Sequence, residues 1–299
     1  MTKIGLIDVD GHNFPSIPLM KISAYHKRLG DEVMWYSGML TQDLDKVYMS
    51  KVFTFTDDFE FPIYAKEVIK GGTGYFYPDG GEPLQGEIEH IYPDYSLYNI
   101  KDTAYGFLTR GCPMACPVCI VSEKEGVKSY KVANLDEFWN GQKEINLLDP
   151  NILACKEHKE LLMQLIESKA RVDFSQGIDA RLLDDEEIDL LKRIRLKNIH
   201  FAWDYMKFSE PVVAGLKKWK KAKPKLPHGS IGTVYVLTNF DTTMEENLYR
   251  IYTIRDLGYY PYVMVYEKWN APKEILRLQR WVNAPAIFKK CKRFEEYKG

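Results

Sequence analysis

The sequence lacks any long hydrophobic run that could cross a membrane or direct secretion. No stretch of about 18 apolar residues occurs anywhere, which excludes a candidate transmembrane helix. The apolar run within residues 1–8 is too short for a signal peptide, and an acidic residue ends it. We therefore expect a cytoplasmic protein with no membrane partner.

The sequence also lacks a large net charge, and it has few cysteines. The 41 basic and 42 acidic residues leave a formal net charge of −1, so the whole molecule should not be strongly attracted to nucleic acid or anionic lipid. Five cysteines in 299 residues, an odd number, fit a reducing compartment better than a disulfide framework. What remains is an ordinary globular composition, 45% hydrophobic and 28% charged, sufficient for one large or two modest domains.

Three of the five cysteines lie close together within residues 109–120. Cys112, Cys116 and Cys119 are spaced C-x-x-x-C-x-x-C, and the glycine and prolines beside them favour turns over a helix. Three thiolates on one tight loop can converge on a single metal centre, and this spacing suits an iron-sulfur cluster. Because three thiolates hold only three irons of a four-iron cubane, the fourth iron would stay open to a small ligand.

Two other interpretations of these cysteines are a zinc site and a set of unrelated buried thiols. A zinc site would need a fourth ligand nearby, and no His or Cys lies between Cys119 and Cys155. The remaining cysteines, Cys155 and Cys291, are isolated from any cysteine pair. We expect these two to be small buried hydrophobic residues, not ligands of a second cluster.

At Cys112, Cys116 and Cys119 the chain resembles the radical SAM superfamily, whose C-x-x-x-C-x-aromatic-C loop binds a [4Fe-4S] cluster with S-adenosylmethionine on the open iron. Val118 stands at the usual aromatic position, where the backbone would still contact the adenine. The resemblance implies an enzyme that reductively cleaves S-adenosylmethionine to a 5'-deoxyadenosyl radical, which then acts on an unknown substrate. It also implies a six-stranded partial barrel and an electron donor such as flavodoxin or ferredoxin.

Residues 1–75 predict a small doubly wound, flavodoxin-like parallel sheet with covering helices. The expected strands are residues 3–9, 31–36 and 46–55, and the expected helices run from the Ser16 cap to Gly30 and over 61–70. This order of elements resembles the cobalamin-binding-type domain that precedes many radical SAM barrels.

Polar residues follow the first expected strand, at the sheet edge where such domains bind ligands. Asp10-x-His12 resembles the start of the D-x-H-x-x-G cobalt-ligand motif, but Pro15 replaces the glycine. Asp8, Asp10 and His12 could instead bond the local backbone. We predict that cobalamin, although possible, is not bound, and that this domain acts as a lid or docking surface for substrate.

Residues 104–270 alternate six times between strand and helix patterns, which predicts a curved parallel sheet; the resemblance implies that this sheet is a six-stranded partial (β/α) barrel. A connector, residues 76–103, precedes it, and a helical closing segment, residues 271–299, follows. The expected strands are residues 104–109, 144–148, 171–175, 198–203, 233–238 and 262–266. Helices are expected over 155–168, from Asp184, and from a capping box at Thr243 to Gly258.

Polar side chains follow the later strands, at the edge where barrel enzymes place their chemistry. S-adenosylmethionine needs acceptors for its amino and ribose groups and a cation or amide for its carboxylate. The usual Gly-Gly-Glu of the resembling family is absent, and residues 147–151 stand there instead. Each polar residue could simply cap a turn. The predicted cofactor-binding residues, besides Val118, are Asp149, Asn151, Gln176, Asp179, Arg181, Asp204, Thr238 and Asn239.

Two non-enzymatic classes remain open. The first class is a non-catalytic iron-sulfur or zinc module that binds RNA through the lysine-rich run Lys217–Lys225. In that module the lysines would bind phosphates and the indole of Trp219 would stack on a base. A solvated helix end explains the same run without RNA. An iron-sulfur electron carrier is the other class, although it leaves the barrel and its polar edge without a role.

Overall fold

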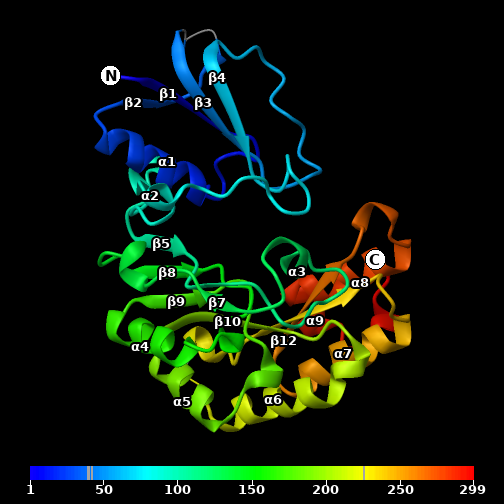
Figure 1. Cartoon of the computed structure of the whole chain (residues 1–299). Helices are drawn as coiled ribbons and strands as arrows, with labels where there is room; N and C mark the ends of the chain where they lie inside the picture. Colours follow the sequence, from blue (N-terminus) through cyan, green and yellow to red (C-terminus); the bar gives the residue numbers. More distant parts are fainter. Residues whose placement is uncertain (39–40, 42, 225) are drawn as a thin grey trace. The chain divides into compact units, whose positions relative to one another are not determined.

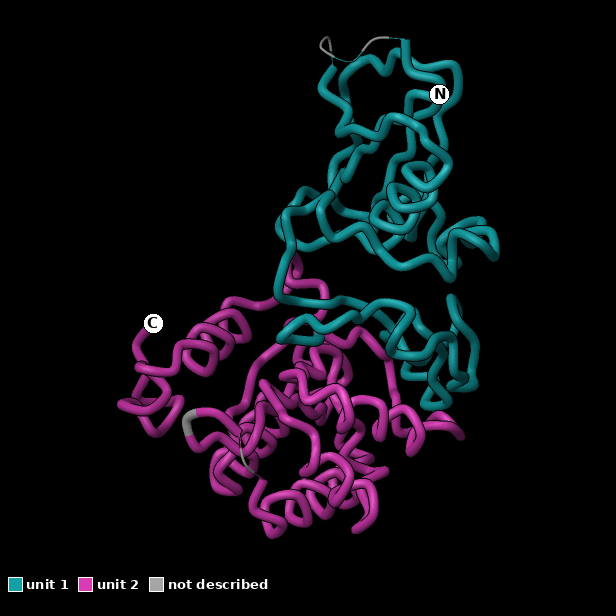
Figure 2. Tube along the Cα trace, turned by 90° about the vertical axis from the view of Figure 1, so that its left-hand side faces the viewer, with its two compact units in different colours: residues 1–145 teal, residues 146–299 magenta. Residues whose placement is uncertain are grey.

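The computed structural model describes residues 1–38, 41, 43–224 and 226–299. It is an α/β protein with a four-stranded parallel sheet and a six-stranded sheet, so the predicted fold class is confirmed. The chain forms two compact units, residues 1–145 and residues 146–299 (Figure 2). The finer boundaries expected at residues 75, 103 and 270 stay predictions.

The four-stranded sheet occupies the first unit, in the order β2-β1-β3-β4 with every neighbouring pair parallel. Its strands are β1 (Lys3–Asp8), β2 (Glu32–Trp35), β3 (Leu44–Ser50) and β4 (Ala65–Gly71). β1 is central, and its four inner residues are buried, as expected for a strand with both faces covered. The predicted strands 3–9 and 31–36 are therefore confirmed.

Helix α1 (Ile17–Arg28) covers one face of this sheet and has the ends that the sequence predicts. The Ser16 hydroxyl accepts a hydrogen bond from the Leu19 amide at 3.5 Å, and Gly30 adopts a left-handed φ of 81° just past the helix. Leu19 and Ile22 pack on the sheet together with Ile4 and Leu6.

The helix predicted over residues 61–70 is wrong, because strand β4 occupies residues 65–71. Lys and Glu in this segment favour a helix, but pairing with β3 along its length, with Val68 opposite Val47, overrides that preference. β4 is an edge strand, and exposed charged residues are common on such edges. The predicted strand 46–55 is also too long, since β3 ends at Ser50.

The six-stranded sheet has the order β12-β11-β10-β9-β8-β5 (Figure 1). All six expected strands exist, with ends shifted by one or a few residues; only β11 begins and ends where predicted. The pairs from β9 to β12 are parallel. The strands are β5 (Thr103–Gly106), β8 (Glu144–Leu147), β9 (Arg171–Phe174), β10 (Leu196–Ala202), β11 (Thr233–Thr238) and β12 (Tyr260–Val265).

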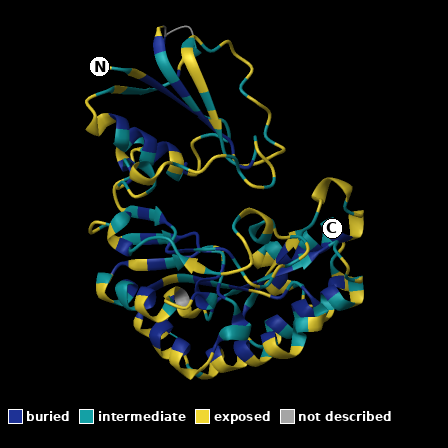
Figure 3. Ribbon diagram, in the orientation of Figure 1, coloured by how far each residue is buried: buried dark blue, intermediate teal, exposed yellow. Residues whose placement is uncertain are grey.

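Helices follow these strands in the second unit, and Figure 1 shows α4 to α7 along one side of the sheet. Asp184 caps α5, and Thr243 with Glu246 forms the predicted capping box of α7. The buried faces of these helices turn toward the sheet (Figure 3). The helices are α4 (His158–Ser168), α5 (Asp185–Arg193), α6 (Ser209–Lys221), α7 (Met244–Asp256), α8 (Lys273–Asn283) and α9 (Pro285–Lys290).

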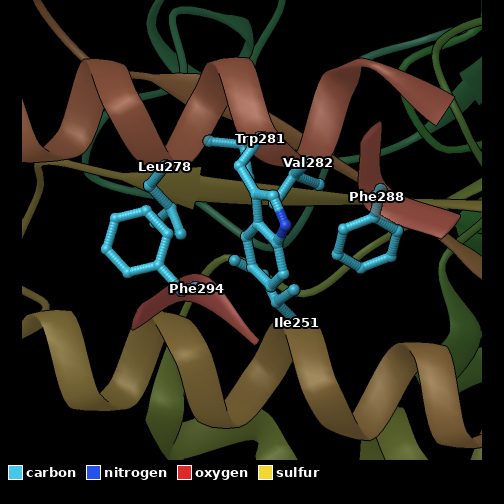
Figure 4. Packing of buried hydrophobic residues seen from close by; sticks show 7 residues of the cluster. Ile251, Leu278, Trp281, Val282, Phe288 and Phe294 are labelled. Carbon is cyan, nitrogen blue, oxygen red and sulfur yellow. The ribbon is translucent and has the colours of Figure 1, made fainter. Parts of the chain in front are cut away.

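The predicted closing helix is α8, which packs through Trp281 on a hydrophobic cluster (Figure 4). Phe288 and Phe294 lie against the indole with ring centroids 4.8 and 5.6 Å away. Ile251 brings α7 into the same cluster. Across the described residues, no helix is both long enough and apolar enough to cross a lipid bilayer.

Short elements occupy the chain between β4 and β8. They are α2 (Gly86–Glu89), which precedes β5, and β6 (Thr109–Arg110), α3 (Val121–Lys124) and β7 (Tyr130–Lys131), which follow it. Tyr95 in this region is buried, and its hydroxyl donates to the Phe138 carbonyl at 2.7 Å while accepting from the Tyr105 amide at 3.0 Å. These contacts join the segment before β5 to the residues after it.

The lysine run lies on α6 and beyond it, and its Lys225 falls outside the described residues. Trp219 is fully buried, and its indole nitrogen donates to the Ile231 carbonyl at 2.8 Å. An indole with no exposed surface cannot stack on a base, so the predicted role of Trp219 in RNA contact is wrong. The buried face of α6 explains the tryptophan instead.

Candidate functional site

The three-cysteine loop belongs to the first unit and is closed at its base by a two-stranded antiparallel sheet. Thr109 pairs with Lys131, and Arg110 pairs with Tyr130. The Val132 amide also donates to the Leu108 carbonyl at 2.8 Å. Backbone pairing therefore joins the two ends of a long irregular segment, which then acts as one closed loop.

Glu125 ties the strand end to the inside of this loop. One carboxylate oxygen accepts from the Arg110 guanidinium at 2.6 Å, and the other accepts from the Gly111 amide at 2.9 Å. The Cys112 amide donates to the Gly126 carbonyl at 3.2 Å, and the Cys119 amide donates to the Cys116 carbonyl at 2.9 Å. Hydrogen bonds thus fix the backbone immediately beside the cysteines, as the predicted turn-rich loop requires.

Gly111 permits the close approach of the two sides of the loop. Its φ is 74°, and a Cβ atom there would lie 2.0 Å from the Lys128 carbonyl oxygen. We expect Gly111→Ala to lower the free energy of unfolding by about 2 kcal/mol or more, because the left-handed backbone and the clash both oppose it. Urea denaturation with tryptophan fluorescence measures this change.

Gly126→Ala is the matched control. Gly126 also has a positive φ of 91°, but a Cβ atom there would meet nothing within 4 Å. That variant should cost only about 1 kcal/mol, the backbone share of the penalty. Equal losses in the two variants would contradict the steric role of Gly111.

The cysteines differ in exposure: Cys112 and Cys116 are half-buried, and Cys119 is exposed. Val118 is half-buried between them. Within the described part of the chain, no three His, Cys, Asp or Glu side chains are grouped so that they could hold a metal ion as they stand. The donor set itself fits an iron-sulfur cluster, since three thiols share one loop whose ends are fixed.

A small, solvent-open pocket of about 80 Å³ lies in the first unit beside the base of this loop. α1 supplies Lys21 to its lining, and β5 with the residues after it supplies Tyr105, Phe107 and Arg110. The guanidinium carbon of Arg110 lies 3.3 Å from the centre of the Phe107 ring. The cavity combines aromatic surface with charged groups, which suits a small polar ligand.

We call the predicted cofactor-binding residues that lie at or after the ends of β8 to β11 the polar edge of the second unit. Asp179 holds two of them, Asn151 and Arg181. Its carboxylate accepts two hydrogen bonds from the Arg181 guanidinium, at 2.8 and 2.7 Å, and one from the Arg181 amide at 3.1 Å. The Asn151 side-chain amide donates to the same carboxylate at 3.2 Å. Three of the predicted residues, from the segments after β8 and β9, are therefore brought together.

Gly215 on α6 allows this arrangement. A Cβ atom at Gly215 would lie 1.8 Å from the Ala180 carbonyl oxygen, so only glycine lets α6 pack so closely on the turn that holds Asp179. On the other side of that turn, the Arg181 guanidinium lies 4.5 Å from the centre of the Phe208 ring. Arg181 is thus held by a carboxylate and an aromatic face together.

Asp204, after β10, is held by the backbone and by a buried cation on α7. Its carboxylate accepts from the Leu237 amide at 3.1 Å. Burial raises the pKa of Asp204, while the Leu237 hydrogen bond and the charges of Arg250 and Arg181 oppose that rise. The fully buried Arg250 donates to the carbonyls of Trp203, Asp204 and Leu237 at 2.7 to 2.9 Å.

The other predicted residues divide between contact with solvent and structural roles. Gln176 is exposed in the turn after β9, whereas Asp149 is buried after β8. Thr238 is fully buried, and its hydroxyl donates to the Met264 carbonyl at 3.1 Å. Asn239 adopts a left-handed φ of 64° and donates to the Tyr266 carbonyl at 2.8 Å. Thr238 and Asn239 thus make the structural hydrogen bonds that were the alternative to cofactor contact.

The polar residues after β1 also bond locally. Asp10 accepts hydrogen bonds from the backbone after β3, and the Thr56 hydroxyl donates to it at 2.7 Å. The His12 imidazole packs on the Trp35 indole with ring centroids 4.2 Å apart. Asp8 accepts from the Tyr98 hydroxyl at 2.7 Å, and burial raises its pKa. The local-bonding alternative therefore describes Asp10 well.

Sequence reasoning missed Glu125 and Arg250. Glu125 gives no sequence signal, because it is an ordinary acidic residue in a charged segment. Arg250 does give one: it lies with Asn247, Ile251 and Ile254 on the buried face of α7, at helical spacing. A cation within such a stripe indicates a buried polar partner.

Neither a scan against protein-family models nor a search of curated proteins gave a match to this chain. The site is therefore interpreted from its own residues.

Proposed function

We propose that this protein is a radical SAM enzyme in which Cys112, Cys116 and Cys119 hold a [4Fe-4S] cluster. The observation that carries the proposal is the closed loop, which keeps three thiols on one short segment with its ends paired. Three thiolates leave one iron open, which an enzyme uses and a structural site does not. When bound, the cluster would supply the electron that cleaves S-adenosylmethionine to a 5'-deoxyadenosyl radical.

The polar edge of the second unit supports a role in binding S-adenosylmethionine. The guanidinium of Arg181 is suited to the carboxylate of that cofactor, and the carboxylates of Asp179 and Asp204 are suited to its amino and hydroxyl groups. Asp179 and Arg181 hold one another through a bidentate pair, so both are oriented before any ligand arrives. The chain's own task is to bind and orient the cofactor, whose chemistry is intrinsic to it.

Anaerobic reconstitution of the full chain tests the proposal. Four irons and four sulfides per chain, followed by release of 5'-deoxyadenosine on reduction with dithionite, would support it. A chain that binds one zinc and no sulfide would instead support a zinc module. A full cluster without cleavage of S-adenosylmethionine would favour an electron carrier.

Gln176 gives a sharper test of the binding edge. It is exposed in the turn after β9, so Gln176→Ala should change the free energy of unfolding by no more than about 0.5 kcal/mol. The same substitution should weaken S-adenosylmethionine binding about tenfold by titration calorimetry of the reconstituted protein. The equally exposed Asp189 on α5 is the control, and Asp189→Asn should bind normally; unchanged affinity in Gln176→Ala would exclude that residue from the cofactor site.

The proposal extends to the first unit and to partners. The pocket beside Arg110 supports a docking role for substrate there, and the hydrogen bonds that Asp10 accepts from the loop after β3 favour this role without cobalamin. A flavodoxin or ferredoxin would supply the electron in the cytoplasm. Uptake of hydroxocobalamin with a shifted absorption spectrum would overturn the first of these points.

A further inference from the structure

One face of the large sheet in the second unit is polar, which is unusual for a strand layer. Along β9 and β11, Val172, Phe174, Val234 and Val236 are buried on one face of the sheet. Asp173 on β9 and Thr233 and Tyr235 on β11 alternate with them, and Ala202 and Tyr262 on neighbouring strands are exposed. We define the polar face by Asn146, Asp173, Asn198, His200, Tyr235 and Tyr262, which come from β8 to β12.

Strand register places these residues side by side. Asp173 is paired with Asn198, and Tyr235 is paired with Tyr262. The His200 and Tyr235 rings stack with centroids 5.0 Å apart and planes only 8° from parallel. Side chains at paired positions point to the same face, so the group forms one continuous surface.

Three buried polar atoms on this face have no hydrogen-bond partner among the residues that the structure describes: Asn146 Oδ1, Asp173 Oδ1 and His200 Nδ1. Asp173 Oδ1 lies 3.6 Å from His200 Nε2, which is beyond hydrogen-bonding distance. Leaving a buried polar atom without a partner costs about 1 to 3 kcal/mol. The three atoms lie on three neighbouring strands, β8, β9 and β10.

The tautomer of His200 follows from Asn198. The Asn198 side-chain oxygen accepts from the Ile199 amide at 3.1 Å, which directs its NH₂ group toward His200 Nε2 at 3.0 Å. Nε2 is then an acceptor, and the proton of the neutral imidazole is on Nδ1. The face therefore offers two acceptors, on Asp173 and Asn146, and one donor, on His200.

We propose that the polar face binds a ligand that carries an ammonium group with a hydroxyl or carbonyl oxygen close to it. An ammonium has donors only, which matches the two acceptor oxygens, and the Asp173 carboxylate matches its charge. The faces of Tyr235 and Tyr262 attract a cation in addition. The neighbouring oxygen of the ligand would accept from His200 Nδ1.

Tyr235 supports a polar, enclosed environment at this surface. Burial raises the pKa of its hydroxyl to about 12, and the charge of Asp173 adds to that rise. Tyr235 therefore stays neutral and presents an aromatic face to a ligand. This binding site does not rest on the proposed function.

Three two-carbon probes of similar size separate charge from shape: ethanolamine, ethylene glycol and glycolate. We expect ethanolamine to shift the imidazole nitrogen resonances of His200 in the ¹⁵N-histidine-labelled full chain, and the shift should saturate. The dissociation constant obtained from this titration should be at least tenfold lower for ethanolamine than for either other probe. His200→Gln assigns the resonances. Asp173→Asn, which preserves shape and removes the charge, should weaken ethanolamine binding at least tenfold, while the exposed Asp189→Asn should not.

Equal binding of the three probes, tighter binding of glycolate, or normal ethanolamine binding by Asp173→Asn would overturn the proposal. Thermal unfolding gives an independent measurement: Asp173→Asn should leave the melting temperature unchanged or raise it, because a binding site carries a stability cost. Asn198→Ala, which breaks two satisfied hydrogen bonds, should lower it. A lower melting temperature in Asp173→Asn would mean that the face is purely structural.

Titration before and after iron-sulfur reconstitution separates this proposal from the proposed function. Loss of ethanolamine binding in both states overturns the ligand site alone. Normal binding by a chain that takes up no cluster overturns the radical SAM assignment alone.

Discussion

Replacing Cys112, Cys116 or Cys119 by alanine is expected to abolish cluster binding, with iron and sulfide per chain falling close to zero after anaerobic reconstitution. Each variant leaves two thiols on the loop, and two thiolates cannot hold the three irons that a site-differentiated cubane binds through protein. The loop base should persist in all three variants, because β6 and β7 pair through backbone atoms alone. Circular dichroism and urea denaturation check that the fold is retained.

Cys155→Ala and Cys291→Ala are the matched controls, and both should keep the full cluster. Burial, together with a hydrogen bond from the thiol to the Glu157 carboxylate at 3.1 Å, raises the pKa of Cys155 to about 11, so its sulfur remains a protonated, poor ligand. The Cys291 thiol donates to the Arg293 carbonyl at 3.2 Å. Loss of the cluster in Cys155→Ala but not in Cys112→Ala would refute the assignment.

Arg250→Leu should produce the largest loss of stability, about 3 to 5 kcal/mol, since it removes a buried cation and leaves several buried polar groups unpaired. Arg250 joins the carbonyls of Trp203, Asp204 and Leu237, so one side chain links the ends of β10 and β11. Burial lowers its pKa to about 10, which still keeps it protonated at neutral pH. The midpoint of urea denaturation gives the measurement.

Arg280→Leu on α8 is the control for Arg250→Leu, because Arg280 is exposed. It should change stability by no more than about 0.5 kcal/mol. A reduced affinity for S-adenosylmethionine in Arg250→Leu at a temperature where the fold persists would further show that Arg250 positions Asp204. Similar stabilities of the two variants would contradict the role given to Arg250.

Local signals predicted most of the fold. The capping box at Thr243 and the cap at Ser16 lie where expected, because these hydrogen bonds involve residues three positions apart. β4 could not be predicted in this way, since its strand conformation depends on pairing with β3 some twenty residues earlier in the chain. Helix propensity is local, whereas an edge strand is defined by its neighbour.

Much less of the site could be predicted. The spacing of the cysteines predicted the loop, but the part played by Glu125 depends on the return of the chain to Gly111. The polar edge predicted Asp179 and Arg181 as candidates without indicating that they bind one another. On β11, the buried valines explain why the sequence predicted a strand. The contacts of the intervening Tyr235 are with His200 and Tyr262 on other strands, so the sequence of β11 alone could not predict them.

The closed base of the cysteine loop has a consequence for how the protein is made. In some metal sites the ligands lie on a segment that folds only when the metal binds. The lifetime of a newly synthesised chain with such a site depends on the supply of metal. Here the segment is closed by contacts between protein atoms, namely the backbone pairing of Thr109 and Arg110 with Lys131 and Tyr130 and the Arg110–Glu125 ion pair. If the loop holds the cluster proposed above, a cell short of iron would accumulate folded chains, and cluster delivery would follow synthesis by a long interval.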